Sequence, residues 1–106
     1  MRYEVLIALE AEKDLIGIYD YMLQEDGLSQ AEEVENRLIE AILSLEELPN
    51  RGKQPSELKE LGITDYRELQ VHPWRIFYYV LQQTVGVVAI LDSRRDVEEL
   101  LRLRVL

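Results

Sequence analysis

The chain has 106 residues and no cysteine. This length suits one domain with one hydrophobic core, so we expect residues 1–106 to form a single domain. The lack of cysteine excludes disulfides and thiolate metal sites and fits a reducing compartment, so the cytoplasm is the expected location. No run approaches the roughly 18 apolar residues of a membrane helix, and the acidic N-terminal stretch differs from a secretion signal. The net charge of −9 disfavours direct nucleic-acid binding, which depends on neutralising phosphates.

The acidic residues are concentrated in the first part of the chain. Residues 1–63 contain six Lys/Arg and fifteen Asp/Glu, whereas residues 64–106 contain six of each. Solubility alone is one explanation of this excess, and local basic patches remain open in the C-terminal part. Acids cluster at Glu10, Glu12 and Asp14 and again at Glu32, Glu33 and Glu35, but carboxylates at i and i+2 point apart on a helix, so we expect a solvated face and no metal site.

The N-terminal half predicts a strand and two helices. Apolar side chains alternate over residues 3–9, which is typical of a strand. From residue 10 the apolar spacing becomes helical and continues to Asp26-Gly27, where glycine can adopt the left-handed conformation that ends a helix. Ser29-Gln-Ala-Glu32 resembles a capping box, so we expect a second helix from there to Pro49. The two helices form a hairpin whose outer faces carry the acid.

The C-terminal half predicts three strands and a short helix. Residues 49–64 contain prolines and glycines, which indicate a loop with one helical turn around 56–61. Strands are predicted over about 65–71, 74–82 and 85–92, the last almost entirely apolar, as in a covered central strand. Asp96 can cap a final helix with Val97, Leu100 and Leu101 facing inward. The expected class is α+β, in the order β-α-α-β-β-β-α, with the hairpin packed on a mainly antiparallel four-stranded sheet.

His72-Pro73 is expected to form the turn between the second and third strands. Proline excludes a type I′ turn, and a four-residue loop over 71–74 is open. Any even-length loop places Leu69 opposite Ile76 and Arg67 opposite Tyr78. One face, directed at the helices, would then carry Leu69, Val71, Ile76, Tyr78 and Val80.

Arg75 falls on the other face, within the most apolar part of the chain. We expect it beside Phe77 and Tyr79 on an aromatic face that the helix pair does not cover. An arginine between aromatic rings is a frequent component of binding surfaces. A structural role, with Arg75 paired to Glu68 or to an acid of the tail, is equally open. An exposed aromatic face would favour a complex over a free monomer.

Three stretches together resemble the ParE/RelE superfamily of small toxins from bacterial type II toxin–antitoxin modules, often labelled plasmid stabilisation proteins. They are the LPNRG turn, YRELQVHPWRIFYYV and ILDSRRDVEELL, and the resemblance covers nearly the whole chain. It implies a RelE/ParE-like fold and a cognate antitoxin whose extended segment wraps the toxin. RelE-like members cleave messenger RNA at the ribosome, whereas ParE-like members poison DNA gyrase.

The resemblance favours the ParE-like branch. Arg67, Arg75 and Arg95 match basic members of the RelE-like catalytic cluster. However, Leu69 stands where a second basic residue is expected, and the tail 102–106 has no tyrosine or histidine. The single histidine lies in the strand turn. Two alternatives remain: a RelE-like mRNA interferase that uses these three arginines as catalytic residues, and a non-toxic member that acts as a binding module.

For a ParE-like toxin we expect a binding protein without catalytic residues, metal or cofactor, whose partners are the antitoxin and DNA gyrase. The antitoxin would lie over the apolar sheet face and the hairpin. Arg94 and Arg95 could hold an acidic segment or phosphate, or pair with neighbouring acids. Two departures from the family are Asp92, where many relatives have histidine, and Leu9-Glu10, which replaces a helix-opening Ser-Pro. The expected partner-binding residues are Arg67, Trp74, Arg75, Phe77, Tyr79, Arg94 and Arg95.

Overall fold

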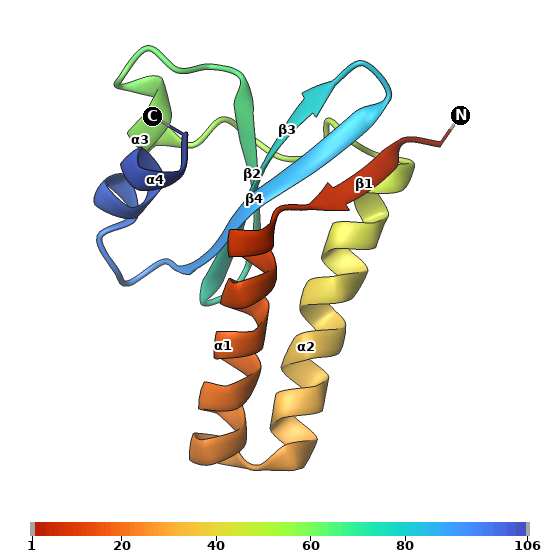
Figure 1. Cartoon of the computed structure of the whole chain (residues 1–106), viewed down its shortest axis with the longest axis vertical. Helices are drawn as coiled ribbons and strands as arrows, with labels where there is room; N and C mark the ends of the chain where they lie inside the picture. Colours follow the sequence, from red (N-terminus) through yellow and green to blue (C-terminus); the bar gives the residue numbers. More distant parts are fainter. Residues whose placement is uncertain (1, 106) are drawn as a thin grey trace.

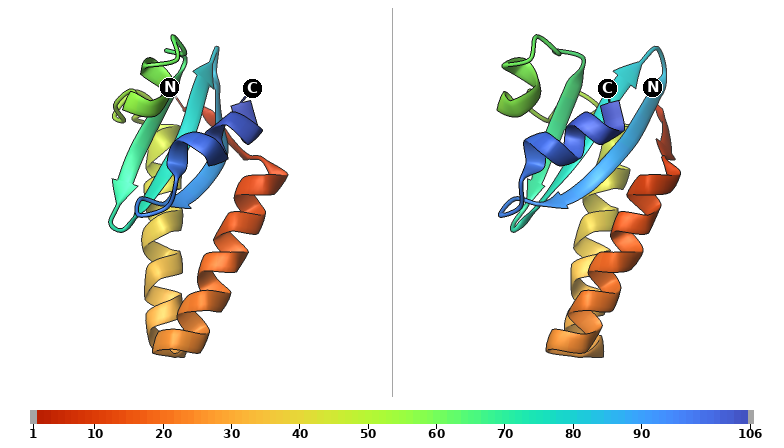
Figure 2. Two further views of the ribbon diagram at one scale, coloured as in Figure 1. Left: turned by 90° about the vertical axis from the view of Figure 1, so that its left-hand side faces the viewer. Right: turned by 60° about the vertical axis from the view of Figure 1, so that its left-hand side comes forward.

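The computed structural model describes residues 2–105 and contains a sheet between two helical layers (Figure 1). The long helices α1 and α2 form an antiparallel hairpin that extends beyond the end of the sheet, and the short helices α3 and α4 lie together near the other side (Figure 2). The elements are β1 (Glu4–Ile7), α1 (Leu9–Asp26), α2 (Leu28–Leu43), a 3₁₀ turn η1 (Ser44–Glu46), α3 (Ser56–Lys59), β2 (Tyr66–Val71), β3 (Trp74–Leu81), β4 (Thr84–Asp92) and α4 (Val97–Val105).

The sheet has four strands in the order β1-β4-β3-β2. β1 runs parallel to β4, and the other two pairs are antiparallel. The predicted order of elements and the mainly antiparallel sheet are therefore confirmed. Leu69 pairs with Ile76 and Arg67 with Tyr78, as the even loop required. Because Val71 pairs with Trp74, the loop between β2 and β3 is the dipeptide 72–73 alone.

Gly27 forms the whole connection between α1 and α2. Its φ of 90° lies in the region that favours glycine, as expected for the end of a helix. The predicted capping box is wrong, because α2 already begins at Leu28, so Ser29 lies inside the helix and makes no cap. This one glycine with a positive φ is enough to reverse the chain. Ala8, the N-cap of α1, also lacks a side-chain cap, as expected from the absence of Ser-Pro.

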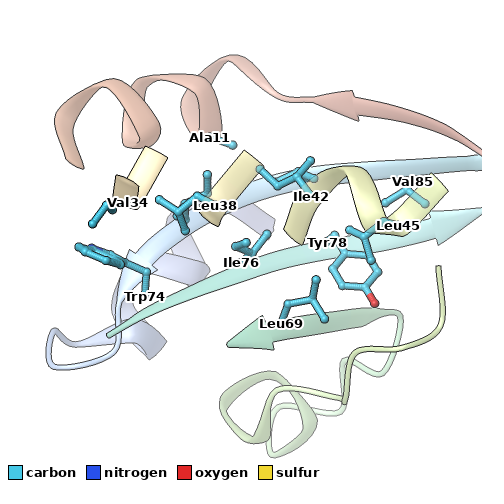
Figure 3. Close-up of a cluster of buried hydrophobic side chains, with 12 residues drawn as sticks. Ala11, Val34, Leu38, Ile42, Leu45, Leu69, Trp74, Ile76, Tyr78 and Val85 are labelled. Atoms are coloured by element: carbon cyan, nitrogen blue, oxygen red, sulfur yellow. The ribbon is translucent and has the colours of Figure 1, made fainter. Parts of the chain in front are cut away.

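The main core fills the space between the hairpin and the sheet (Figure 3). The predicted inward face of β2 and β3 is confirmed, since its members either belong to this core or pack against it. Trp74 also lies here, close to Val34 of α2, and only 7% of its surface is exposed. In the free chain, little of the Trp74 indole surface is therefore accessible to a partner. The buried members are Ala11, Val34, Leu38, Ile42, Leu45, Leu69, Trp74, Ile76, Tyr78, Val85, Val87 and Ile90.

A second core covers the opposite face of the sheet. Phe77 is completely buried there by Leu58 of α3 and by Val97 and Leu101 of α4. The prediction of an exposed aromatic face is therefore wrong for Phe77, the residue at the centre of that face. The inward-facing pattern of α4 was predicted, but the pattern did not specify which sheet face the helix covers. Asp96 caps this helix as expected, accepting a hydrogen bond from the Glu99 N–H at 3.2 Å.

Candidate partner-binding surfaces

Arg75 is buried between two carboxylates, Glu57 of α3 and Glu68 of β2. Its Nε and Nη2 donate to Glu68 at 2.9 and 2.6 Å, and its Nη1 and Nη2 donate to Glu57 at 2.7 and 2.8 Å. Both pairs are bidentate, the geometry in which guanidinium and carboxylate bind most strongly. The guanidinium carbon also lies 4.9 Å from the centre of the Phe77 ring. We call Glu57, Glu68 and Arg75 the arginine triad.

The two carboxylates of the triad compensate the positive charge of Arg75 within the chain. Its side chain is 11% exposed, and that of Glu68 is 1% exposed. Hydrogen bonds to Glu57 and Glu68 raise the pKa of Arg75 above its usual range, and hydrogen bonds from Arg75 lower the pKa of Glu57. Pairing with Glu68 was one of the two predicted alternatives and is confirmed. The sequence did not identify Glu57, because it lies on the short helix α3, 18 positions before Arg75, and no local pattern connects the two.

Arg67 and Tyr78 hold the LPNRG turn against the sheet. Arg67 Nη1 donates to the carbonyls of Asn50 and Gly52 at 3.2 and 2.7 Å. The Tyr78 hydroxyl donates to the Pro49 carbonyl at 2.8 Å and accepts from the Gly52 N–H at 3.0 Å. A Cβ at position 52 would lie 2.6 Å from this hydroxyl, so the turn requires glycine. The motif therefore has a structural role in fixing the loop.

The three arginines of the nuclease alternative do not form one cationic site. Arg67 lies on the hairpin side of the sheet, opposite Tyr78, whereas Arg75 lies on the α3/α4 side with Glu68. Arg95 follows the far end of β4 and lines a groove beside α1. A scissile phosphate needs cations that converge on one point. The strand alternation that separates Arg67 from Arg75 prevents this convergence.

Trp74, Arg94 and Arg95 border a groove of about 780 Å³ between the overhanging part of α1 and the end of the sheet. Ile18, Tyr21 and Met22 contribute its apolar wall. Arg95 is exposed, and no ion pair or side-chain hydrogen bond involves it among residues 2–105. Of the expected partner-binding residues, these three are brought together by the fold.

Arg94 is clamped by Asp92 at the edge of this groove. Its Nε and Nη2 donate to the Asp92 carboxylate at 2.9 and 2.6 Å, and its backbone N–H donates at 2.9 Å. These contacts lower the pKa of Asp92 to about 2. Pairing with a neighbouring acid, one of the predicted alternatives for Arg94, is therefore confirmed. Asp92 thus acts here as an anion that orients Arg94.

Tyr79 lies partly exposed over Gly86, its pairing partner on β4. Its ring meets that of Tyr66 edge to face, with the centres 6.0 Å apart. A Cβ at position 86 would overlap the Tyr79 ring, so glycine makes room for it. Tyr79 and Arg67 line a separate shallow hollow at the sheet edge. The seven expected residues thus divide among this hollow, the second core and the groove beside α1.

An ion pair that the sequence did not indicate joins α4 to α1. Arg104 donates to both oxygens of Asp14 at 2.8 and 2.9 Å and to the Val88 carbonyl at 3.1 Å. Asp14 also accepts from the Ile90 N–H at 2.9 Å. The two side chains thereby satisfy backbone groups of β4 beyond the point where β1 ends. Asp14 was expected on a solvated face, and no periodicity could have linked residues 90 positions apart.

The sheet has a helical hairpin on one face and short helices on the other. This arrangement and the order of the elements define a small toxin-like α+β domain of the RelE/ParE type. The profile of the family described as "ParE toxin of type II toxin-antitoxin system, parDE" matches residues 5–97. The chain therefore belongs to the ParE toxin family.

A solved structure described as the chromosomal ParDE TA system from P. aeruginosa has a similar fold. The TM-score is 0.71 at 21% sequence identity, over 86% of this chain and 96% of that one. At this identity the similarity concerns the fold alone. No curated protein matches the chain. Within the described residues, none of the helices combines the length and apolar character needed to cross a bilayer.

Proposed function

We propose that this chain is the toxin of a type II toxin–antitoxin module, that it inhibits DNA gyrase by binding, and that a cognate antitoxin neutralises it. The observation that carries the proposal is the family match over residues 5–97. The arrangement of the arginines speaks against a catalytic cluster and so favours a binding role for the chain. Arg75 is paired with two carboxylates, and Arg67 donates from Nη1 to carbonyls of the LPNRG turn.

The groove beside α1 is the proposed contact site for one partner. It combines an apolar wall with Arg95, whose guanidinium is free to bind an acidic side chain or a carbonyl. Arg75 and Phe77 would contribute indirectly, by holding α3, β2 and α4 together. The RNA-cleaving alternative requires Arg67, Arg75 and Arg95 around one phosphate, and the separation of these residues speaks against it.

The test is inducible expression of the chain, followed by parallel assays of purified protein on gyrase supercoiling and on translating ribosomes. Gyrase inhibition with trapped, cleaved DNA and intact message supports the proposal. Cleaved message would overturn it and make the arginines catalytic. Arg95→Ala should weaken inhibition, whereas Arg2→Ala, which alters an exposed arginine at the other end of the sheet, should leave it unchanged.

A further inference from the structure

Basic side chains gather at the outer edge of β2, where α2, the LPNRG turn and the β2–β3 turn meet. Arg37 of α2, Arg51 of the LPNRG turn and His72 line a shallow hollow of about 480 Å³. Arg51 also lines a second hollow, of about 350 Å³, together with Lys53. All four side chains are exposed. We call Arg37, Arg51, Lys53 and His72 the basic corner.

The cations of the basic corner have no anionic partner within the described residues 2–105. Six of the twelve Lys/Arg of the chain form ion pairs there, and Arg37, Arg51 and Lys53 are not among them. Glu40 lines the first hollow without forming an ion pair. Glu68 lines the second, but its carboxylate is held in the arginine triad. The corner is therefore an uncompensated basic site in a chain that has 21 Asp/Glu.

The backbone that carries the basic corner is fixed. Hydrogen bonds with β2 and β3 hold the LPNRG turn, and Lys53 exchanges two backbone hydrogen bonds with Glu68 at 2.7 and 3.1 Å. Arg51 Nη1 donates to Ser44 Oγ at 2.8 Å, which orients the guanidinium and leaves its Nε and Nη2 for a ligand. Cations held in place before binding lose less entropy when a ligand arrives.

A backbone donor faces the same edge. Glu68 directs its backbone groups away from β3, toward Lys53, and alternate residues of a strand direct theirs to the same edge. The N–H of Gln70 therefore points outward between the two hollows, both of which Gln70 lines. No acceptor for this N–H is found among residues 2–105. The basic corner thus offers an anion both side-chain and backbone donors.

The charge of the basic corner selects the kind of anion. Its three Lys/Arg together with Glu40 leave a net charge of +2, before any contribution from His72. A single carboxylate binds one guanidinium in the bidentate manner seen between Asp92 and Arg94, so it would leave most of the corner unpaired. A phosphate monoester carries about −1.5 to −2 charges at pH 7 and three acceptor oxygens, which match the corner in charge and in donors.

A long polyanion fits the surroundings less well than a compact one. The helix that carries Arg37 belongs to residues 9–43, which contain ten Asp/Glu and two Lys/Arg. A nucleic-acid backbone that extends past the corner would approach these like charges, which is unfavourable. We propose that the basic corner binds a phosphate monoester, of a free nucleotide or of a phosphorylated side chain. This site goes beyond the proposed function and does not depend on it.

Isothermal titration calorimetry of the full-length chain tests the proposal with two phosphate monoesters, adenosine monophosphate and a short phosphoserine peptide. Adenosine and the unphosphorylated peptide are the matched ligands without phosphate, and a short DNA duplex presents phosphodiesters. The Arg51→Gln/Lys53→Gln variant removes one arginine and one lysine from the corner. Lys59→Gln/Arg95→Gln removes the same charges from unpaired positions elsewhere. All substituted side chains are exposed, and circular dichroism checks that each variant folds.

We expect a phosphate monoester to bind, its counterpart without phosphate not to bind, and the DNA duplex to bind more weakly. Tighter binding of adenosine monophosphate would assign the site to a free nucleotide, and tighter binding of the phosphoserine peptide would assign it to a phosphorylated protein. The Arg51→Gln/Lys53→Gln variant should lose at least about tenfold in affinity, the effect of removing one charge-assisted contact. The Lys59→Gln/Arg95→Gln variant should bind as the parent does.

Three results would overturn the proposal. They are the absence of binding of both monoesters at about 1 mM, an equal loss of affinity in the two double variants, and tighter binding of the duplex than of either monoester. Arg37→Gln, a single exposed change on α2, should show the same loss and replaces the corner variant if that protein does not fold. Because the titration contains no gyrase, a chain that binds phosphate but spares gyrase would refute gyrase inhibition alone, and the reverse result would refute the phosphate site alone.

Discussion

The arginine triad provides the sharpest test of how this fold is stabilised. In Arg75→Ala the Glu68 carboxylate, with a side chain only 1% exposed, would lose its charge partner and two hydrogen bonds. Leaving one member of a buried pair uncompensated costs about 3–5 kcal/mol. A domain of this size has a free energy of unfolding of about 5–15 kcal/mol, so the variant should be severely destabilised. Replacing Arg75 and Glu68 together by Met and Leu should recover much of this loss, because no buried charge remains.

Urea unfolding followed by the fluorescence of Trp74, the single tryptophan, measures this effect beside the substituted residue. Glu57→Gln is the matched control: this side chain is 24% exposed, so its loss should cost only about 1 kcal/mol. The lowered pKa of Glu57 gives that contribution a pH dependence. It is fully present above the ordinary value of 4.5 and is lost as the pH falls through the lowered folded-state pKa. An Arg75→Ala protein within about 1 kcal/mol of the parent would refute the assigned role of the triad.

Three further variants test separate features by the same urea assay. Gly17→Ala should stabilise α1 by about 0.5–1 kcal/mol, because a Cβ there meets nothing within 4 Å and only backbone entropy changes; destabilisation would contradict this. Tyr78→Phe should cost about 1–3 kcal/mol, since the Gly52 N–H loses its acceptor, and an unchanged midpoint would count against the turn's dependence on this hydroxyl. Asp92→Asn should lower stability above pH 3.8, with the deficit vanishing toward pH 2 as the parent carboxylate is protonated; a deficit independent of pH would exclude the charge as its cause.

Features with a local cause were predictable from the sequence. The pairing of Leu69 with Ile76 followed from strand alternation and an even loop, and the break at Gly27 followed from glycine's conformational freedom. Features that depend on how distant segments pack were missed. Nothing in the pattern of residues 97–101 told which face of the sheet α4 covers, and hence that Phe77 would be buried. Glu57 was missed for the same reason, because its position opposite Arg75 depends on where the loop before β2 lies.

These missed contacts change where the chain's charge is available to partners. Local basic patches were left open for residues 64–106, yet Arg75, Arg94 and Arg104 are held by carboxylates, and Arg67 donates to carbonyls of the LPNRG turn. The positive charge of these arginines is therefore compensated by groups of the same chain. Residues 9–43, in contrast, contain ten acidic and only two basic residues. Residues 9–43 thus carry most of the net negative charge of the chain, although Asp14 is paired with Arg104 and Glu10 with Lys13. Association should therefore accelerate with the positive charge of the partner and slow steeply with salt, because long-range attraction acts on the rate of encounter. Stopped-flow association of the cognate antitoxin at two ionic strengths measures this, and a rate independent of salt would show that the hairpin charge does not steer binding.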